Sequence, residues 1–467
     1  MNNTEYQGFW WLPSNPNESV VGVLTFKPSE IIELKLIGAL VGNSGGNQDH
    51  VNLPIILGVV ERKIITLSDC IRTKFNSSRP GYDSETYRVK FVFIGEHFQD
   101  PQEIRFNEVS IQSTYLSDWV NFSPIQELPT IDDTNNLQQF TFIYNKPESI
   151  KANIIEGEIS VFYGCQNSGK LYDIDFKQLS SISIKVNQFI SFEDLYSQYI
   201  CPILDFLTLA TGQPNSVEKI YFPDINNELK SVEMLFFSNS IESKKILSTD
   251  DLLFSLADIE SDFSLMLQLW FNSYKELESI FNLIFSTEYK PDMYLESKFL
   301  NIAQAAESYH RRRCKNQVLT QPEHDARIES ILNNTPEEYK KWLNAKLHFS
   351  NEPPLLERLM DLLDKTKKVM NPLVKDHAKF AKKVRDTRNY FTHWNTDLQD
   401  KAAQGEELFR ITQTLLFMLQ SCLLMELGCT PERCAELISK NKKYQYAVRN
   451  ISKTEKSQAT RRVQEAE

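Results

Sequence analysis

The sequence is poor in the residues that build metal, redox and nucleotide-cofactor sites. Its 467 residues include seven cysteines, seven histidines and fifteen glycines. No Cys-x-x-Cys pair is present, which excludes the usual zinc ribbons and dithiol redox motifs. The first half of the chain holds no Gly-rich phosphate loop, no cluster of metal ligands and no pair of candidate catalytic residues. We therefore expect neither a metal nor a cofactor.

The cysteines are scattered and odd in number, which is typical of reduced thiols in a cytoplasmic protein. Cys422, Cys429 and Cys434 lie close together, but their spacings of seven and five match no common zinc motif. A metal site formed by these three thiols stays open as a minor alternative.

From the sequence we expect no signal peptide and no membrane-spanning run. The sequence begins MNNTEYQGFWW, without the basic and apolar segments of a signal peptide. Its most apolar run, residues 411–428, is interrupted by Gln413, Gln420 and Glu426. We expect a buried helix there, no membrane partner and a cytoplasmic location.

Acidic residues outnumber basic residues in the chain as a whole. The chain carries 51 Lys and Arg against 62 Asp and Glu, a net charge of −11. This balance excludes a protein coated with basic surface, although it allows a confined basic site. The hydrophobic share of 41% indicates a globular chain, and the length suggests two or three domains.

The pattern of apolar residues changes character along the chain. Before about residue 190, short alternating runs such as YRVKFVFIG (87–95) and GEISVFYG (157–164) predict β-strands. Residues 192–212 have helical spacing, and from about residue 260 the pattern stays helical. The predicted fold is α+β and multidomain. An antiparallel β-rich domain, either sandwich-like or an open barrel, is expected over residues 1–260, and an all-α helical bundle over residues 261–467.

One predicted helix carries an unusual polar edge. Around the segment AKKVRDTRNYFTHWN (381–395), a core-facing stripe is expected at Phe380, Val384, Thr387, Phe391 and Trp394, in a helix expected to begin at Pro372. The other face of this helix carries polar residues. Asn389 and His393 are four residues apart and stack, and Arg388 lies about 100° round the helix from Asn389.

This helix is locally basic. From 375 to 388, six Lys and Arg residues stand against two Asp residues, a net charge of +4. Arg388 and His393 form the one Arg-x4–6-His pattern in the chain. A basic segment beside an Arg/His pair in an acidic protein indicates a confined anion site.

The segment RNYFTH resembles the Arg-x4–6-His motif of HEPN domains, including the polar residue that often follows the arginine. The earlier segment NIAQAAESYHRRR (301–313) is similar to an early HEPN helix. In the first half, ITLSDC (65–70), FIGEHF (93–98), EVSIQSTYLSDWV (108–120) and ILDFLTLATGQP (203–214) resemble the N-terminal part of ApeA-type proteins. These are bacterial anti-phage abortive-infection proteins with a C-terminal HEPN ribonuclease domain.

The resemblance implies metal-independent cleavage of RNA. It assigns Arg388, Asn389 and His393 as the catalytic residues, and the products would carry 2′,3′-cyclic phosphate and 5′-hydroxyl ends. The other residues expected to bind RNA or support the site are Arg385, Lys382, Glu307 and His310. Glu307 is expected to pair with Arg388, and a solvated helix face is an equally open interpretation for Glu307 and His310.

The resemblance also implies partners. HEPN domains usually pair, so we expect a homodimer through residues 261–467, with the apolar 411–428 helix burying part of the contact. The N-terminal region is expected to hold the nuclease inactive until a phage-encoded protein triggers it. The alternatives are a catalytically inactive HEPN module that acts as a scaffold or neutralises a toxin, and a carbohydrate-binding or hydrolase role for the β-rich half.

Overall fold

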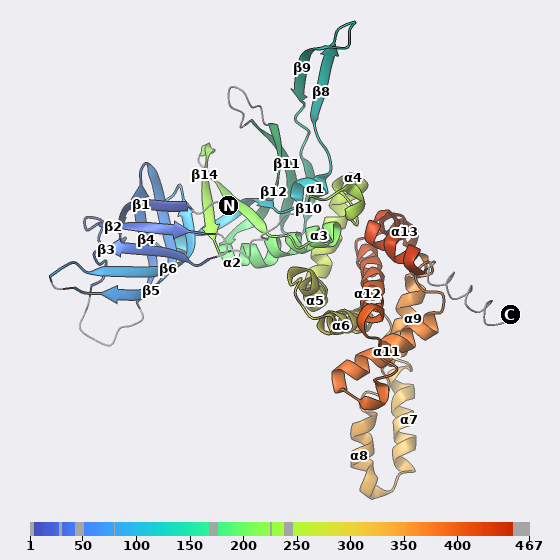
Figure 1. Cartoon of the computed structure of the whole chain (residues 1–467). Coiled ribbons are helices and arrows are strands. Elements are labelled where there is room, and N and C mark those ends of the chain that lie inside the picture. Colours follow the sequence, from blue (N-terminus) through green and yellow to red (C-terminus); the bar gives the residue numbers. More distant parts are fainter. Residues whose placement is uncertain are drawn as a thin grey trace. The chain divides into compact units, whose positions relative to one another are not determined.

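The computed structural model describes residues 4–27, 30–42, 51–78, 80–167, 176–224, 227–237 and 246–451. The chain divides into two compact units, one rich in strands and one helical (Figure 1). The β-rich unit consists of residues 1–207, 214–247 and 255–268, and the helical unit of residues 208–213, 248–254 and 269–467.

The first six strands close into an antiparallel barrel. They lie in the order β6-β3-β2-β1-β4-β5, and β5 pairs back with β6. Alternate residues of these strands point inward, and buried side chains such as Trp10, Leu24 and Tyr87 fill the interior. The strands are β1 (Thr4–Trp11), β2 (Val20–Phe26), β3 (Ile32–Ile37), β4 (Asn52–Val60), β5 (Lys63–Asn76) and β6 (Ser84–Ile94).

The same sheet continues beyond the barrel because one edge of β6 pairs with two different strands. Its residues 84–89 pair with β3, and its residues 91–94 pair with β14. From β14 the sheet runs outward in the order β14-β13-β7-β12-β11-β10. These strands are β7 (Arg105–Ser113), β10 (Ile150–Ile154), β11 (Gly157–Asn167), β12 (Phe176–Ser191), β13 (Val217–Asp224) and β14 (Asn227–Phe236).

The β-rich region also contains elements that lie outside this large sheet. Strands β8 (Ile125–Ile131) and β9 (Leu137–Tyr144) form a separate two-stranded sheet, and α1 (Leu116–Val120) precedes it. The helix expected near residues 192–212 is present as α2 (Phe192–Leu195), a π-helical turn (Tyr196–Ile200) and α3 (Cys201–Thr211). A short helix, α4 (Leu256–Ile259), follows.

The predicted fold class is confirmed: a β-rich region over residues 4–236 precedes a helical region over residues 256–451. Of the sandwich and the open barrel that the sequence left as alternatives, the structure is nearer to the barrel, since twelve of the described strands form one continuous sheet that closes on itself at one end. Alternating apolar patterns are the same in a sandwich and a barrel. The 14-residue β5 pairs with both β4 and β6, and that pairing closes the barrel. The domain boundary at residue 260 stays a prediction.

The helical unit is a bundle around α12. Helix α12 packs against α6, and α11 packs against both α6 and α9. Helices α7 and α8 form a hairpin between α6 and α9 in the chain (Figure 1). The helices of this region are α5 (Phe263–Tyr289), α6 (Leu295–Arg313), α7 (Gln321–Asn333), α8 (Glu337–Leu347), α9 (Leu355–Lys365), α10 (Lys367–Met370), α11 (His377–His393), α12 (Gly405–Glu426) and α13 (Pro431–Lys440).

Helix α12 contains the most apolar run of the chain. By length and composition it is able to cross a membrane, but 72% of its apolar window is buried inside the protein. This is the pattern of a core helix. The helix is followed by Gly428, whose φ of 88° provides a left-handed terminator. Most of its apolar side chains are covered by its own chain, and the expectation that residues 411–428 bury part of a dimer contact stays a prediction.

Candidate functional site

Helix α11 begins later than the sequence indicated. The expected start was Pro372, but the first helical residue is His377, and the Asp376 carboxylate caps it by accepting a hydrogen bond from the Lys379 backbone N–H at 2.9 Å. Residues 371–376 form a turn and bend between α10 and α11. An aspartate cap satisfies a free N–H of the first turn, which a proline four residues earlier does not do.

The buried face of α11 is shorter than the predicted stripe. Val384, Thr387 and Phe391 are buried, whereas Phe380 is only partly buried. The Thr387 hydroxyl donates to the Lys383 carbonyl at 2.7 Å and accepts from the Ala403 N–H at 2.9 Å. These contacts fix α11 against the segment that leads into α12.

Trp394 does not belong to that stripe, so its predicted core position is wrong. The helix ends at His393, and Trp394 adopts a left-handed conformation with a φ of 48°. This turn directs the indole out of the helical path, and the side chain is exposed. Its ring centroid lies 5.6 Å from that of Tyr390 in an edge-to-face arrangement. Trp394 therefore covers the end of the helix beside His393.

Arg388, Asn389 and His393 lie on the accessible side of α11, as the sequence indicated. The Arg388 guanidinium donates from Nη1 to Asn389 Oδ1 at 3.2 Å and from Nη2 to Glu307 Oε2 at 3.0 Å. The expected pair between Glu307 and Arg388 is therefore present. His393 is the last helical residue and is exposed. Within the described residues its ring makes no hydrogen bond, so nothing there fixes its orientation.

Two other predicted residues lie one to two turns before Arg388 on α11. Lys382 is exposed to solvent. Arg385 is half-buried and donates to Oδ1 of the buried Asp386 from Nε at 2.9 Å and from Nη2 at 2.6 Å. The basic charge of Arg385 is therefore partly neutralised within its own helix, and Lys382 is the freer cation for an incoming phosphate.

Glu307 connects Arg388 to a chain of ion pairs between α6 and α9. Arg311 Nη2 lies 3.9 Å from Glu307 Oε1, and it pairs more closely, at 2.8 Å, with Glu352 Oε2. The same Glu352 oxygen accepts from Arg358 Nη2 at 3.1 Å. Arg358 is almost completely buried and also donates from Nε to the Pro353 carbonyl at 2.9 Å. The arginine of the site is thus held indirectly by residues of α9 and of the segment before it.

His310 lies outside the accessible site, so its expected contact with RNA is wrong. Its ring is fully buried. Nδ1 faces Arg358 Nη1 at 3.2 Å, and Nε2 faces Asp361 Oδ2 at 2.9 Å. Because a guanidinium can only donate, Nδ1 must accept and Nε2 must carry the proton given to Asp361. His310 is a packed link between α6 and α9, and its neighbour Glu307 faces the site.

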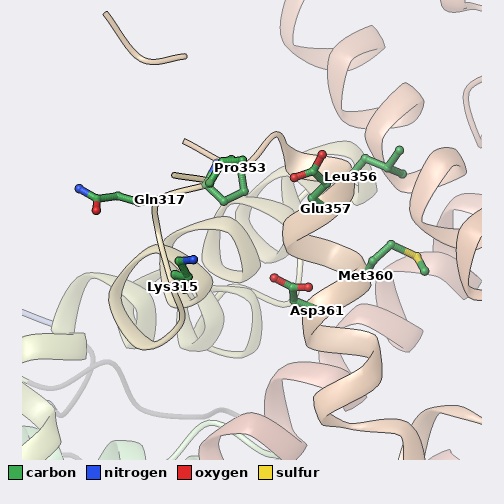
Figure 2. Close-up of a pocket in the computed structure, with 8 residues that line it drawn as sticks. Lys315, Gln317, Pro353, Leu356, Glu357, Met360 and Asp361 are labelled. Atoms are coloured by element: carbon green, nitrogen blue, oxygen red, sulfur yellow. The ribbon is translucent and has the colours of Figure 1, made fainter. Parts of the chain in front are cut away.

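A pocket of about 350 Å³ lies where this network reaches the surface (Figure 2). Asp361 projects from α9 toward the segment that carries Lys315, on the opposite wall. The pocket is lined by Lys315, Gln317, Val318, Pro353, Leu356, Glu357, Met360 and Asp361. None of the predicted catalytic residues lines it.

Glu352, Arg358 and Asp361 were not predicted from the sequence. The segment LLERLMDLLDK places Arg358 among leucines that face the core, and a charge at such a position was the available signal. Its partners His310 and Glu352 lie 48 and 6 residues away in sequence. Only the packing of α6 against α9 identifies them.

The three C-terminal cysteines are not arranged as an open metal site. Cys422 and Cys434 are buried, and burial raises the pKa of the Cys422 thiol to about 12. A hydrogen bond with Cys429, together with burial, raises the pKa of Cys434. Among the residues that the structure describes, no group of three or more His, Cys, Asp or Glu side chains is placed to hold a metal ion.

The accessible edge of α11 therefore combines a positioned guanidinium, an amide and an exposed imidazole. A guanidinium binds phosphate oxygens, and an imidazole transfers protons near neutral pH. On a helical bundle, this combination is the one that the resemblance to HEPN domains implies.

The comparisons with known families agree with that class. Residues 300–433 match the family described as Apea-like HEPN, and residues 5–270 match the family described as ApeA N-terminal domain 1. The chain therefore belongs to the ApeA family of HEPN proteins, and this membership supports an anti-phage role. No curated protein and no solved structure matches the chain.

Replacing Glu307 tests whether its contact positions Arg388. We expect Glu307→Gln to lower RNA cleavage roughly tenfold, which corresponds to about 1.4 kcal/mol of lost transition-state stabilisation. The amide keeps the shape of the carboxylate but loses the charge that attracts the guanidinium. Single-turnover cleavage of a fluorescent RNA measures the effect, and Glu296→Gln, an exposed change on the same helix, is the control. Faster cleavage by Glu307→Gln would show instead that the ion pair restrains Arg388.

Proposed function

We propose that this protein is a metal-independent endoribonuclease of anti-phage defence, acting through Arg388, Asn389 and His393. The observation that carries the proposal is the arrangement of these residues on α11. Arg388 is fixed by Glu307 and Asn389, His393 is open to solvent, and both lie in a domain of the HEPN family. HEPN domains are typically ribonucleases.

The chemistry uses a nucleophile that RNA itself supplies. His393 takes the proton of a ribose 2′-hydroxyl, and the 2′-oxygen forms a bond to the adjacent phosphorus. The bond from phosphorus to the 5′-oxygen of the next nucleotide breaks, and the leaving oxygen takes a proton from water, which leaves a 2′,3′-cyclic phosphate and a 5′-hydroxyl. Arg388 stabilises the negative charge on the phosphoryl oxygens during this step. The His393 imidazolium then returns its proton to the solvent. Asn389 holds the guanidinium and is near enough to bind the same phosphate, and Lys382 attracts the RNA backbone.

The proposal includes assembly and control. The active form is a cytoplasmic homodimer through the HEPN region, in which two α11 helices share one RNA groove. The exposed Trp394 beside His393 is a suitable contact residue, because aromatic side chains dominate protein interfaces. The N-terminal region holds the nuclease inactive until a phage-encoded protein binds. A sedimentation mass of a single chain for the active protein would exclude this assembly.

One observation favours the alternative of an inactive binding module. Within the described residues the His393 ring has no hydrogen-bond partner, and a general base is usually oriented by one. In the ribonuclease proposal, the RNA or the second chain supplies that partner. A scaffold or toxin-neutralising module needs no oriented imidazole, so measurement of cleavage decides between the two.

The ends of cleaved RNA provide that measurement. We expect the purified protein, activated by its trigger if necessary, to cleave RNA in the presence of EDTA. The new 3′ ends should be cyclic phosphates, and the new 5′ ends should accept phosphate from a polynucleotide kinase without prior dephosphorylation. Sequencing of RNA from expressing cells, with and without the kinase step, shows both features. Cleavage that stops in EDTA, or products with 5′-phosphate ends, would contradict the mechanism.

A further inference from the structure

The β8–β9 hairpin has two chemically different faces. In an antiparallel pair, residues opposite each other project to the same side. The pairs Glu127–Phe142 and Pro129–Phe140 therefore share one face with Ile125–Tyr144, and the pair Ile131–Leu137 extends that face beyond a register shift. The opposite face carries Gln126, Leu128, Thr130, Gln139, Thr141 and Ile143. We call the first set, which is apolar apart from Glu127, the aromatic face.

The outer part of the aromatic face is partly exposed to solvent. Phe140 and Phe142 are 43% and 42% exposed, and Ile131 and Leu137 are 57% and 60% exposed. The rings of Phe140 and Phe142 lie 5.0 Å apart and form one continuous apolar surface. An isolated two-stranded hairpin is only marginally stable in water, and contiguous exposed apolar surface usually marks an interaction site.

The charge of the hairpin restricts what can bind to it. Residues 122–145 contain no lysine or arginine, and they contain Glu127, Asp132 and Asp133, a net charge of −3. Hydrogen bonds from the Thr134 side chain, the Asn136 N–H and Gln138 lower the pKa of Asp132, so the tip stays negative. This charge repels RNA, an anionic lipid surface and the same hairpin of a second copy.

We propose that the aromatic face is a docking site for another protein, through an apolar segment flanked by lysine or arginine. The hairpin forms a sheet of two strands alone, so among the described residues each outer strand edge remains available for backbone pairing. An extended segment that adds to such an edge would place alternate side chains over Phe140 and Phe142. Its basic flanks would lie near Glu127 at one end and near Asp132 and Asp133 at the tip. This inference does not depend on ribonuclease activity.

Selection from a displayed library of random twelve-residue peptides tests the proposal with the full-length protein. We expect enrichment of peptides with alternating apolar residues and flanking Lys or Arg, and depletion of Asp and Glu. The double variant Phe140→Ser/Phe142→Ser should bind an enriched synthetic peptide on the order of 100-fold more weakly, because two apolar contacts are lost. Leu128→Ser is the matched control, since Leu128 is similarly exposed on the opposite face and should bind as the wild type does.

Several outcomes would overturn the proposal. These are no enrichment with the wild type, equal enrichment with the double variant, or affinity that does not fall as salt is raised. Self-association that depends on Phe140 and Phe142 would assign the face to a second copy. A clear loss of thermal stability in the double variant would show that the two rings are covered within the chain. Unchanged melting of the double variant, with lost peptide binding, is the expected result.

Discussion

His393→Ala and Arg388→Ala are expected to slow RNA cleavage by about 100-fold or more without unfolding the protein. Removal of a general base or of a phosphate clamp usually has an effect of this size. His393 is exposed and Arg388 is only partly buried, so each truncation should lower the free energy of unfolding by about 1 kcal/mol or less. Both variants should also lose protection against phage. Cleavage of a defined RNA and thermal melting of the same preparations measure the two quantities.

Phe391 on α11 and Trp394, which directly follows the helix, provide controls for the stability of these variants. Phe391 is buried against Phe299, so Phe391→Ala should cost about 3–5 kcal/mol and lose activity together with structure. Trp394 is exposed, so Trp394→Ala should melt close to the wild type. If folded His393→Ala keeps full activity and protection, His393 is not the base and the binding-module alternative is correct. If it unfolds as Phe391→Ala does, His393 contributes to the core.

Arg358→Ala is expected to lower the free energy of unfolding by about 3–5 kcal/mol, because it breaks a buried charged network. The change leaves His310 Nδ1, the Pro353 carbonyl and part of Glu352 without their donor, and it opens a cavity between α6 and α9. Urea denaturation followed by circular dichroism measures the loss.

Arg311→Ala is the matched control for this experiment. Arg311 binds the same Glu352 but is exposed, and exposed ion pairs contribute about 1 kcal/mol or less. Equal losses of stability for the two variants would show that the burial of Arg358 does not determine its contribution to the free energy of unfolding. At denaturant concentrations where Arg358→Ala remains folded, reduced cleavage would further indicate that the network helps to hold Glu307 and Arg388.

Much of the architecture follows from local patterns. Alternation with period two identified the strands of the first half, and helical spacing identified the second half, because burial of one face imposes these periods. The same periods do not specify strand partners. The closed barrel depends on β5 pairing with both β4 and β6, and no local pattern distinguishes that arrangement from a sandwich.

The candidate site, too, was predicted only in part from the sequence. The sequence by itself determined that Arg388, Asn389 and His393 share the polar side of one helix, since helical geometry fixes residues one to five apart. It also indicated Glu307 as the partner of Arg388. Tertiary structure alone decided that His310 is buried, that Trp394 is exposed and that Arg358 joins the network. The physical reason is that burial and ion pairing arise where α6, α9 and α11 pack together, between residues that lie up to 81 positions apart in the sequence.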